Sequence, residues 1–320
     1  MKKIKSGILG VIVGDALGLP VQFKDRSWFY KHPVTELTGL GVFNKPKGSW
    51  SDDGSLTLAL AASLSKGYDP KDIMDEFSNW LFYGKYTQDD QAYDIGQTTA
   101  NAIMNYHRGI PYHKCGGKSY YDNGNGSLMR ILPLVFYLRV HFGEDFTTKP
   151  YAMGIIHEVS SLTHAHELAK MACGIYLSIA NELLQSQDIE SAVKQGIQKA
   201  LTFYISDIVF QKVKNQFHRL EDLEEFRVLD ESRIGSSGFV KDTLEASIWC
   251  LLNTNTYEEA VLKAVNLGYD TDTTAAVCGG LAALAYDKIK LEWIQDIHEL
   301  SIVNDICESF EHSLKKEEAV

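Results

Sequence analysis

The chain has 320 residues, of which 45% are apolar and 11% aromatic, so it can bury a large core and is not generally disordered. Its formal net charge of −11 gives a field that repels phosphate backbones, so we do not expect it to bind nucleic acid. The five cysteines form no Cys-x-x-Cys pair. This pattern is typical of buried, reduced thiols in a cytoplasmic protein and argues against a zinc site.

The N-terminus imitates a signal peptide, with a basic start over residues 1–5 and an apolar run over residues 7–13. Asp15 then interrupts the apolar stretch, and no Ala-x-Ala-like cleavage site follows it, so a buried first helix is the better interpretation. Nowhere does an uninterrupted apolar stretch approach the ~20 residues that a membrane span needs. The sequence therefore predicts a cytoplasmic protein without a membrane span.

Apolar residues recur at helical spacing along nearly the whole chain, whereas the period-two alternation of strands is scarce. Residues 135–138 would suit a strand, but Pro133 before them fits the first turn of a helix equally well. We therefore predict an all-α fold and a single domain over residues 1–320, with 203–231 as an irregular excursion and 313–320 as a frayed tail. The clearest helical stripes are Leu56, Leu60 and Leu64; Ile73, Phe77, Trp80 and Leu81; Leu168, Met171, Ala172, Ile175 and Ile179; and Leu244, Ile248, Leu251 and Leu252.

Two short acidic clusters each open a predicted helix. In the first, Ser51 precedes an apolar helical run as an N-cap, and Asp52 and Asp53 fall in the first turn, where the helix dipole favours negative charge. The second, Asp270-Thr271-Asp272-Thr273, precedes the helical stretch Ala275–Tyr286. Each cluster alone is explained equally well as an ordinary acidic helix start.

Together the clusters carry four carboxylates and several hydroxyls, which are the ligands that Mg²⁺ and Mn²⁺ prefer. If the carboxylates converge, they repel one another unless cations lie between them, and their number favours two metal ions over one. The twelve-residue ligand spacing of a calcium-binding EF-hand is absent. The pair of clusters therefore predicts a divalent-metal site in a helical enzyme.

Seven motifs stand in order along the chain: Gly14–Phe23, Trp50–Asp53, Asp94–Thr99, Gly124–Arg130, Leu162–Ala165, Ser237–Ala246 and Gly268–Thr273. Together they resemble the ADP-ribosylglycohydrolase family, the relatives of dinitrogenase reductase-activating glycohydrolase. The resemblance covers about residues 6 to 287. It implies a compact, all-α orthogonal bundle with a dinuclear Mg²⁺ or Mn²⁺ centre that hydrolyses the bond between the distal ribose of ADP-ribose and a modified group.

The resemblance also implies roles for the two acidic clusters. Asp272 would bridge the two ions, and Asp52 and Asp272 would take part in catalysis. The family often has Thr where Ser51 stands, and Ser keeps the hydroxyl ligand. The metal ligands implied in this way are Ser51, Asp52, Asp53, Asp270, Asp272 and Thr273.

Further positions would contact ADP-ribose. The loop Asn125-Gly126-Ser127 resembles the family's diphosphate-binding loop, and its glycine would let backbone N–H groups approach phosphate oxygens; an ordinary Gly-Asn turn is the alternative. The family pattern also places His164 and Tyr269 at the substrate. Gly238 and Phe239 would line the adenosine end, where Phe239 would stack on the base or else be an ordinary core residue.

The catalytic base is the least determined role. Asp94 lies in a segment that resembles the arginine-type hydrolases, where it would stand near the scissile bond, although a surface acid is the alternative. Gln22 stands where many family members have Glu, and it would contact substrate but cannot accept a proton at neutral pH. Asp94 or one of the metal-ligating aspartates is therefore the predicted base.

We expect release of ADP-ribose from N-linked ADP-ribosyl-arginine on a protein or small molecule. ADP-ribosyl-serine or O-acetyl-ADP-ribose would be alternative substrates. A two-metal phosphatase and a non-catalytic member that binds ADP-ribose or serves structurally are further alternatives. The sequence does not indicate the oligomeric state.

Overall fold

The computed structural model describes residues 2–186 and 188–318. Helices make up 68% of the chain, and no β-strand occurs within the described residues, so the predicted all-α fold is confirmed. The β-compatible residues 135–138 lie in a helix that begins at Pro133. The α-helices are α1 Lys2–Gly18, α2 Arg26–Phe29, α3 Asp52–Leu64, α4 Pro70–Tyr83, α5 Gln97–His107, α6 Pro133–Phe142, α7 Pro150–Ser161, α8 Glu167–Leu183, α9 Ile189–Ile205, α10 Leu223–Arg227, α11 Val240–Leu252, α12 Tyr257–Asn266, α13 Thr271–Tyr286, α14 Leu291–Gln295 and α15 Leu300–Glu318.

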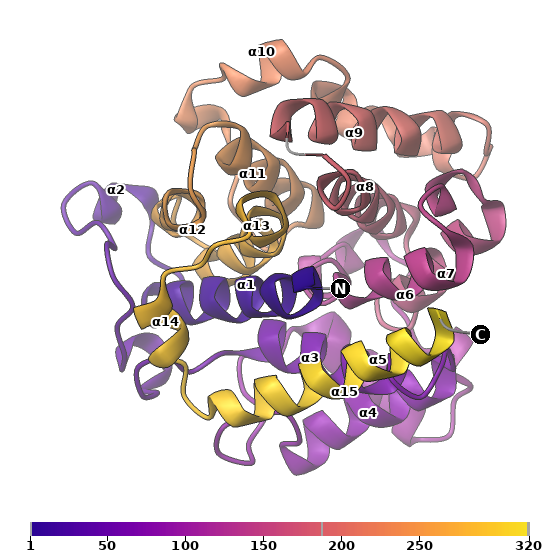
Figure 1. Ribbon diagram of the computed structural model, residues 1–320, viewed down its shortest axis with the longest axis horizontal. Coiled ribbons are helices and arrows are strands. Elements are labelled where there is room, and N and C mark those ends of the chain that lie inside the picture. The colour runs from indigo at the N-terminus through magenta and orange to yellow at the C-terminus, as the bar shows by residue number, and fades with distance from the viewer. Residues whose placement is uncertain (1, 187, 319–320) are drawn as a thin grey trace.

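The centre of the bundle is the pair α1 and α13, which come from opposite ends of the sequence (Figure 1). Two glycines of α1 make this pair unusually close. A Cβ on Gly14 would overlap the carbonyl oxygen of Ala275, and one on Gly10 would overlap that of Gly279. Close packing of the two backbones brings the C-terminal end of α1 next to the start of α13, where the second acidic cluster lies.

Replacing Gly14 by alanine is expected to destabilise the protein by about 3 kcal/mol, because the new methyl group must push α13 away. The matched control is Gly154→Ala in α7, where a Cβ meets nothing within 4 Å and the helix gains about 0.5–1 kcal/mol. Chemical denaturation of both variants checks this prediction. A Gly14→Ala variant as stable as the Gly154→Ala variant would contradict the close approach.

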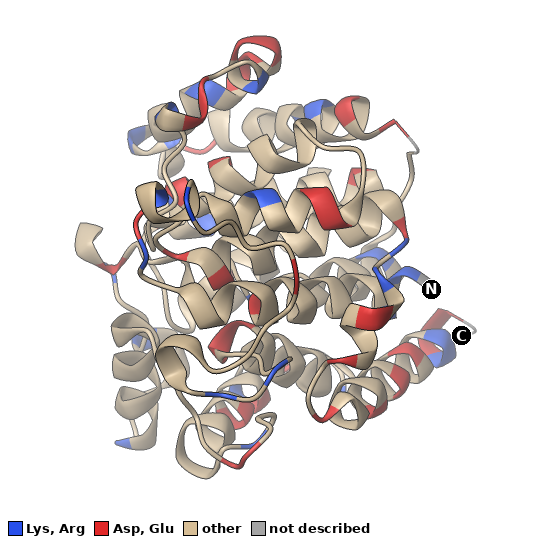
Figure 2. Ribbon diagram, turned by 90° about the vertical axis from the view of Figure 1, so that its left-hand side faces the viewer, with Lys and Arg blue, Asp and Glu red and all other residues tan. Residues whose placement is uncertain are grey.

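Helix α1 is buried, as predicted from the interruption at Asp15. One helical stretch, Lys3–Val21, is long and apolar enough by composition to cross a membrane, and 78% of its most apolar window is buried inside the protein. Figure 2 shows acidic and basic residues interspersed over the outer segments of the molecule. Asp15, by contrast, is fully buried within α1.

Two boundary predictions need correction. Residues 203–205 still belong to α9. The rest of 203–231 consists mostly of 3₁₀ turns and α10, and its buried side chains Phe210, Phe217 and Phe226 pack it on the bundle. The tail predicted to fray from residue 313 is helical to Glu318, because Leu314 is buried and holds the last turns of α15 against the core. Residues 319–320 lie outside the described part of the chain.

Candidate active site

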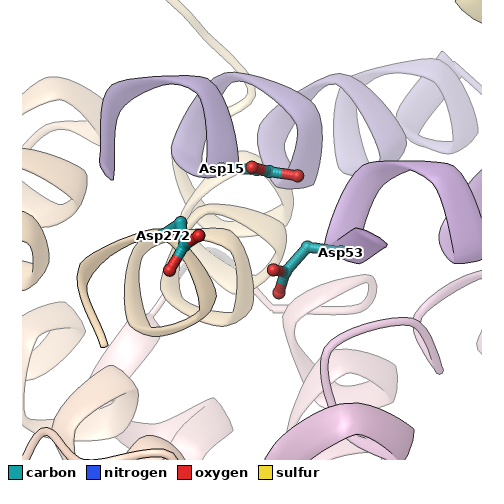
Figure 3. A group of neighbouring side chains, drawn as sticks. All are labelled: Asp15, Asp53 and Asp272. Atoms are coloured by element: carbon teal, nitrogen blue, oxygen red, sulfur yellow. The ribbon is translucent and has the colours of Figure 1, made fainter. Parts of the chain in front are cut away.

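Three buried carboxylates face one another where three helices meet (Figure 3). Asp15 comes from the last turn of α1, Asp53 from the first turn of α3 and Asp272 from the first turn of α13, with one oxygen of each within 4.8 Å of the others. The two acidic clusters of the sequence therefore do converge. Asp15, which interrupts the apolar run near the N-terminus and lies in the Gly14–Phe23 motif, is the third member.

Asp15 explains how the first cluster is held in place. Its carboxylate accepts hydrogen bonds from the backbone N–H of Ser51, at 3.0 and 2.9 Å, and of Gly54, at 2.9 Å. Ser51 is the N-cap of α3, as predicted, because its Oγ accepts a hydrogen bond from the Asp53 N–H at 3.3 Å. Asp15 thus caps the same helix start from another helix. A lone acid within a buried apolar run was the sequence signal for such a role.

The hydroxyls of both clusters meet on one carboxylate. Ser51 Oγ donates to Asp53 Oδ2 at 3.1 Å, and Thr273 Oγ1 donates to the same oxygen at 3.2 Å. Asp53 Oδ1 and Asp272 Oδ2 are buried and have no hydrogen-bond partner among the described residues. A buried acceptor without a donor is costly, so two such oxygens in one cluster of carboxylates are suited to a cation. The carboxylate and hydroxyl donors fit Mg²⁺ or Mn²⁺.

The electrostatics support this assignment of a cation-binding role. Burial, followed by repulsion from neighbouring carboxylates, raises the pKa values of Asp52, Asp53 and Asp272 well above the usual range of aspartate. Burial also raises the pKa of Asp15 to about 7, although the amides of Gly54 and Ser51 oppose the shift. Without a cation, these groups would hold protons in a range where exposed aspartates are ionised.

A cleft of about 490 Å³ opens above the carboxylates. Ser51, Asp53 and Asp272 are buried and do not line it, whereas most of the predicted substrate contacts do. The predicted residues in its wall are Gln22, Asp52, Asp94, Asn125, Gly126, His164, Gly238, Tyr269, Asp270 and Thr273.

Asp94 lies in the cleft wall in a left-handed backbone conformation, with φ of +53°. Burial raises the pKa of its carboxyl group, and the charge of Asp270 adds to this, whereas the neighbouring side chains of Asp272 and Gln22 act in the opposite direction. Asp94 is therefore no ordinary surface acid. Gln22 is also buried, and its Oε1 has no partner among the described residues.

The loop Asn125–Ser127 forms one wall of the cleft, but its side chains are committed to other contacts. Asn125 Nδ2 donates to Asp270 Oδ2 at 2.7 Å and to Thr243 Oγ1 at 2.9 Å, so this amide holds the second acidic cluster. The hydroxyl of Ser127 is fully buried against Ser160 and Cys173 and lies outside the cleft lining. Contacts of this loop with a ligand therefore depend mainly on its backbone.

Exposed aromatic side chains form the rim of the cleft. Phe23 and Tyr269 are 65% and 50% exposed, and their segments are tied together by two backbone hydrogen bonds of 2.7 Å, from Phe23 N to Tyr269 O and from Tyr269 N to Lys24 O. Phe23 was not predicted as a site residue, although it ends the first motif. Phe239 lies outside the cleft lining, with its ring centroid 5.9 Å from that of Tyr120.

Comparison with known proteins agrees with this architecture. The family model described as ADP-ribosylglycohydrolase matches residues 1–319. ADP-ribosylarginine hydrolase Tri1 from Serratia proteamaculans is 26% identical, covering 99% of this chain and 81% of that protein. ADP-ribosyl-(dinitrogen reductase) glycohydrolase from Rhodospirillum rubrum is 28% identical, covering 90% of this chain and 88% of that protein.

A solved structure titled "ADP-ribosylglycohydrolase-related protein complex" superposes with a TM-score of 0.75 at 28% identity, covering 98% of both chains. The all-α fold is thus shared with a known class of proteins. The chain belongs to the ADP-ribosylglycohydrolase family.

Proposed function

We propose that this protein is a metal-dependent hydrolase that releases ADP-ribose from N-linked ADP-ribosyl-arginine. The observation that carries the proposal is the pair of buried, unpartnered oxygens on Asp53 and Asp272 beneath a cleft whose wall holds Asp94. The relatives named for ADP-ribosylarginine and for ADP-ribosyl-(dinitrogen reductase) support the substrate class. The modified arginine would belong to a protein or a small molecule.

We propose two divalent ions, Mg²⁺ or Mn²⁺, as cofactors. Ions of this kind, when bound, orient ribose hydroxyls and lower the pKa of water. The orphaned oxygens of Asp53 and Asp272, and the hydroxyls that meet on Asp53, support this assignment. The residues that would hold the ions are Ser51, Asp52, Asp53, Asp270, Asp272 and Thr273.

The residues of the cleft wall would then carry the proton transfer. Water attacks C1 of the distal ribose, the C1–N bond breaks, and the guanidinium group leaves with that electron pair as neutral guanidine, which then receives the proton that the attacking water loses. Asp94 takes the proton of the attacking water as general base. Gln22 lines the same cleft, where its amide would orient Asp94, and it cannot take the proton itself. The carboxylate of Asp94 would also attract the cationic guanidinium of the substrate.

A panel of substrates tests this proposal. ADP-ribosyl-arginine, ADP-ribosyl-serine and O-acetyl-ADP-ribose are incubated with the protein and either Mg²⁺ or Mn²⁺, and free ADP-ribose and inorganic phosphate are both measured. We expect ADP-ribose from the arginine conjugate. Release from only the serine or acetyl conjugate would change the substrate, phosphate release would indicate a phosphatase, and no product with any substrate would indicate a non-catalytic member.

Metal removal should reveal the charge repulsion in the site. In the folded state the pKa values of the buried aspartates are raised above the value of about 4 that aspartate has in the unfolded chain. Without metal, the contribution of these groups to stability is therefore fully present below about pH 4. It is lost as the pH rises through the raised pKa values. Metal ions bind the ionised form, so protons compete with them. We expect Mg²⁺ or Mn²⁺ to raise the melting temperature more at about pH 8 than at about pH 6, relative to chelator. An equal gain at both pH values would contradict this linkage.

A further inference from the structure

Arg130 is a fully buried arginine that the proposed reaction does not use. It follows the cleft loop in the Gly124–Arg130 motif, and its guanidinium makes no ion pair with a carboxylate of the described residues. Burial lowers the pKa of its guanidinium to about 10, which still leaves the group charged at neutral pH. A buried charge without a counter-ion is costly and needs hydrogen bonds that repay its burial.

Those hydrogen bonds lead to one residue of the cleft wall and to the chain neighbour of another. One terminal nitrogen, Nη1, donates to the carbonyl oxygen of Gly126, and Nη2 donates to Thr163 Oγ1 at 2.8 Å. The guanidinium carbon also lies 4.6 Å from the ring centre of Phe77, which gives the charge a favourable aromatic face. Arg130 therefore joins the loop at Gly126 to the residue that precedes His164.

The contact with Thr163 determines how the imidazole of His164 is protonated. Arginine can only donate, so Thr163 Oγ1 accepts from Arg130 and its own hydrogen points away from the guanidinium. His164 Nδ1 lies 2.8 Å from this hydroxyl, which has no other acceptor among the described residues, so we assign Nδ1 as the acceptor of that hydrogen. Burial, with the charge of Arg130, lowers the pKa of His164 to about 3, so the ring is neutral. In a neutral ring whose Nδ1 accepts, the proton is on Nε2.

The Nε2 side of the ring faces the cleft loop. A Cβ on Gly126 would come within 2.9 Å of His164 Cε1, and one on Gly124 within 3.5 Å of Nε2. The backbone of His164 is fixed separately, because its N–H donates to Ser160 O at 2.8 Å. Arg130 is thus not needed to place the backbone of His164. Its hydrogen bonds instead position the imidazole ring, through Thr163, and the carbonyl group of Gly126.

We propose that Arg130 is a positioning residue that, through Thr163, holds the Nε2–H of His164 toward the cleft as a donor for an oxygen of bound ADP-ribose. This inference rests on the proposed function for the identity of the ligand. The position of the proton on the imidazole does not depend on any ligand, so the two can be tested separately.

The first measurement is the ring tautomer of His164, read from ¹⁵N chemical shifts of the histidines in the full-length protein without ligand. The wild type should show a fixed Nε2–H form. Thr163→Val, which removes the hydroxyl but keeps the shape, and Arg130→Met should both lose it, whereas Thr163→Ser should retain it. Arg139→Met is the matched control, since Arg139 bonds to Asn181 and Glu144 away from the cleft. An unchanged tautomer in Thr163→Val overturns the proposal, even if Arg130→Met fails to fold.

The second measurement is the affinity for ADP-ribose, determined by calorimetry in the presence of Mg²⁺. We expect about tenfold weaker binding for Thr163→Val and Arg130→Met, the scale of one lost hydrogen bond, with affinity restored in Thr163→Ser. Altered tautomers with unchanged affinity would overturn the positioning role. If the wild type itself does not bind ADP-ribose, the proposed function fails, and the tautomer measurement alone decides whether Arg130 positions His164.

Discussion

Replacing Asp272 by asparagine is expected to abolish the release of ADP-ribose from ADP-ribosyl-arginine, lowering the rate by about a thousandfold or more. Asp272 is fully buried, its Oδ2 has no partner among the described residues, and its Oδ1 accepts from the Thr273 N–H at 2.9 Å. Oδ2 is therefore the oxygen that no hydrogen bond within the described residues satisfies, and it is the best placed to bind a cation. Asparagine keeps the size of the side chain but removes the charge, so the rate with saturating Mg²⁺ or Mn²⁺ measures the loss of that ligand.

The same substitution should stabilise the fold of the metal-free protein. Removing one charge from a buried carboxylate cluster relieves repulsion, so the melting temperature in chelator should rise while the gain on adding metal disappears. The matched control is Glu258→Gln, since Glu258 occupies the second position of α12 as Asp272 does in α13. A near-normal rate in the Asp272→Asn variant with Mg²⁺ would disprove the metal mechanism.

The helix starts of this site could be predicted from sequence because they depend on local rules. Ser51 caps α3 and the acidic residues occupy first turns, as the N-cap and dipole preferences require. Because the carboxylates of the two clusters would repel one another if they converged, the sequence also predicted a cation between them. Local patterns, together with the ordered motifs, were therefore enough to predict the all-α fold and the meeting of two clusters that lie far apart in the chain.

Roles that depend on tertiary contacts could not be predicted in the same way. The carboxylate of Asp15 accepts backbone hydrogen bonds from residues 51 and 54, and nothing near Asp15 in sequence specifies those partners. The glycines predicted a tight loop at 125–127, but the direction of the Asn125 amide is set by Asp270 and Thr243, from other elements. Leu314 likewise orders the C-terminal helix through contact with the core.

Replacing Asp94 by asparagine is the test that separates proton transfer from metal binding. We expect kcat on ADP-ribosyl-arginine to fall by about 100-fold to 10,000-fold, the usual contribution of a general base, because the amide cannot take the proton of the attacking water. The gain in melting temperature on adding Mg²⁺ should remain, since Asp94 is not among the proposed ligands. Asp89→Asn is the matched control, as Asp89 lies in the same connection but pairs with Lys45 at the surface.

The pH profile decides whether Asp94 acts as the base or only shapes the cleft. Burial raises the pKa of Asp94, so its protonated, inactive form persists to a higher pH than for an exposed aspartate. The wild-type rate should therefore rise with pH through that raised value, and Asp94→Asn should lose this acidic limb while retaining ADP-ribose affinity. If the variant keeps both the wild-type kcat and the limb, the base is another group. Gln22 is excluded by its chemistry, which would leave a carboxylate of the acidic clusters in that role.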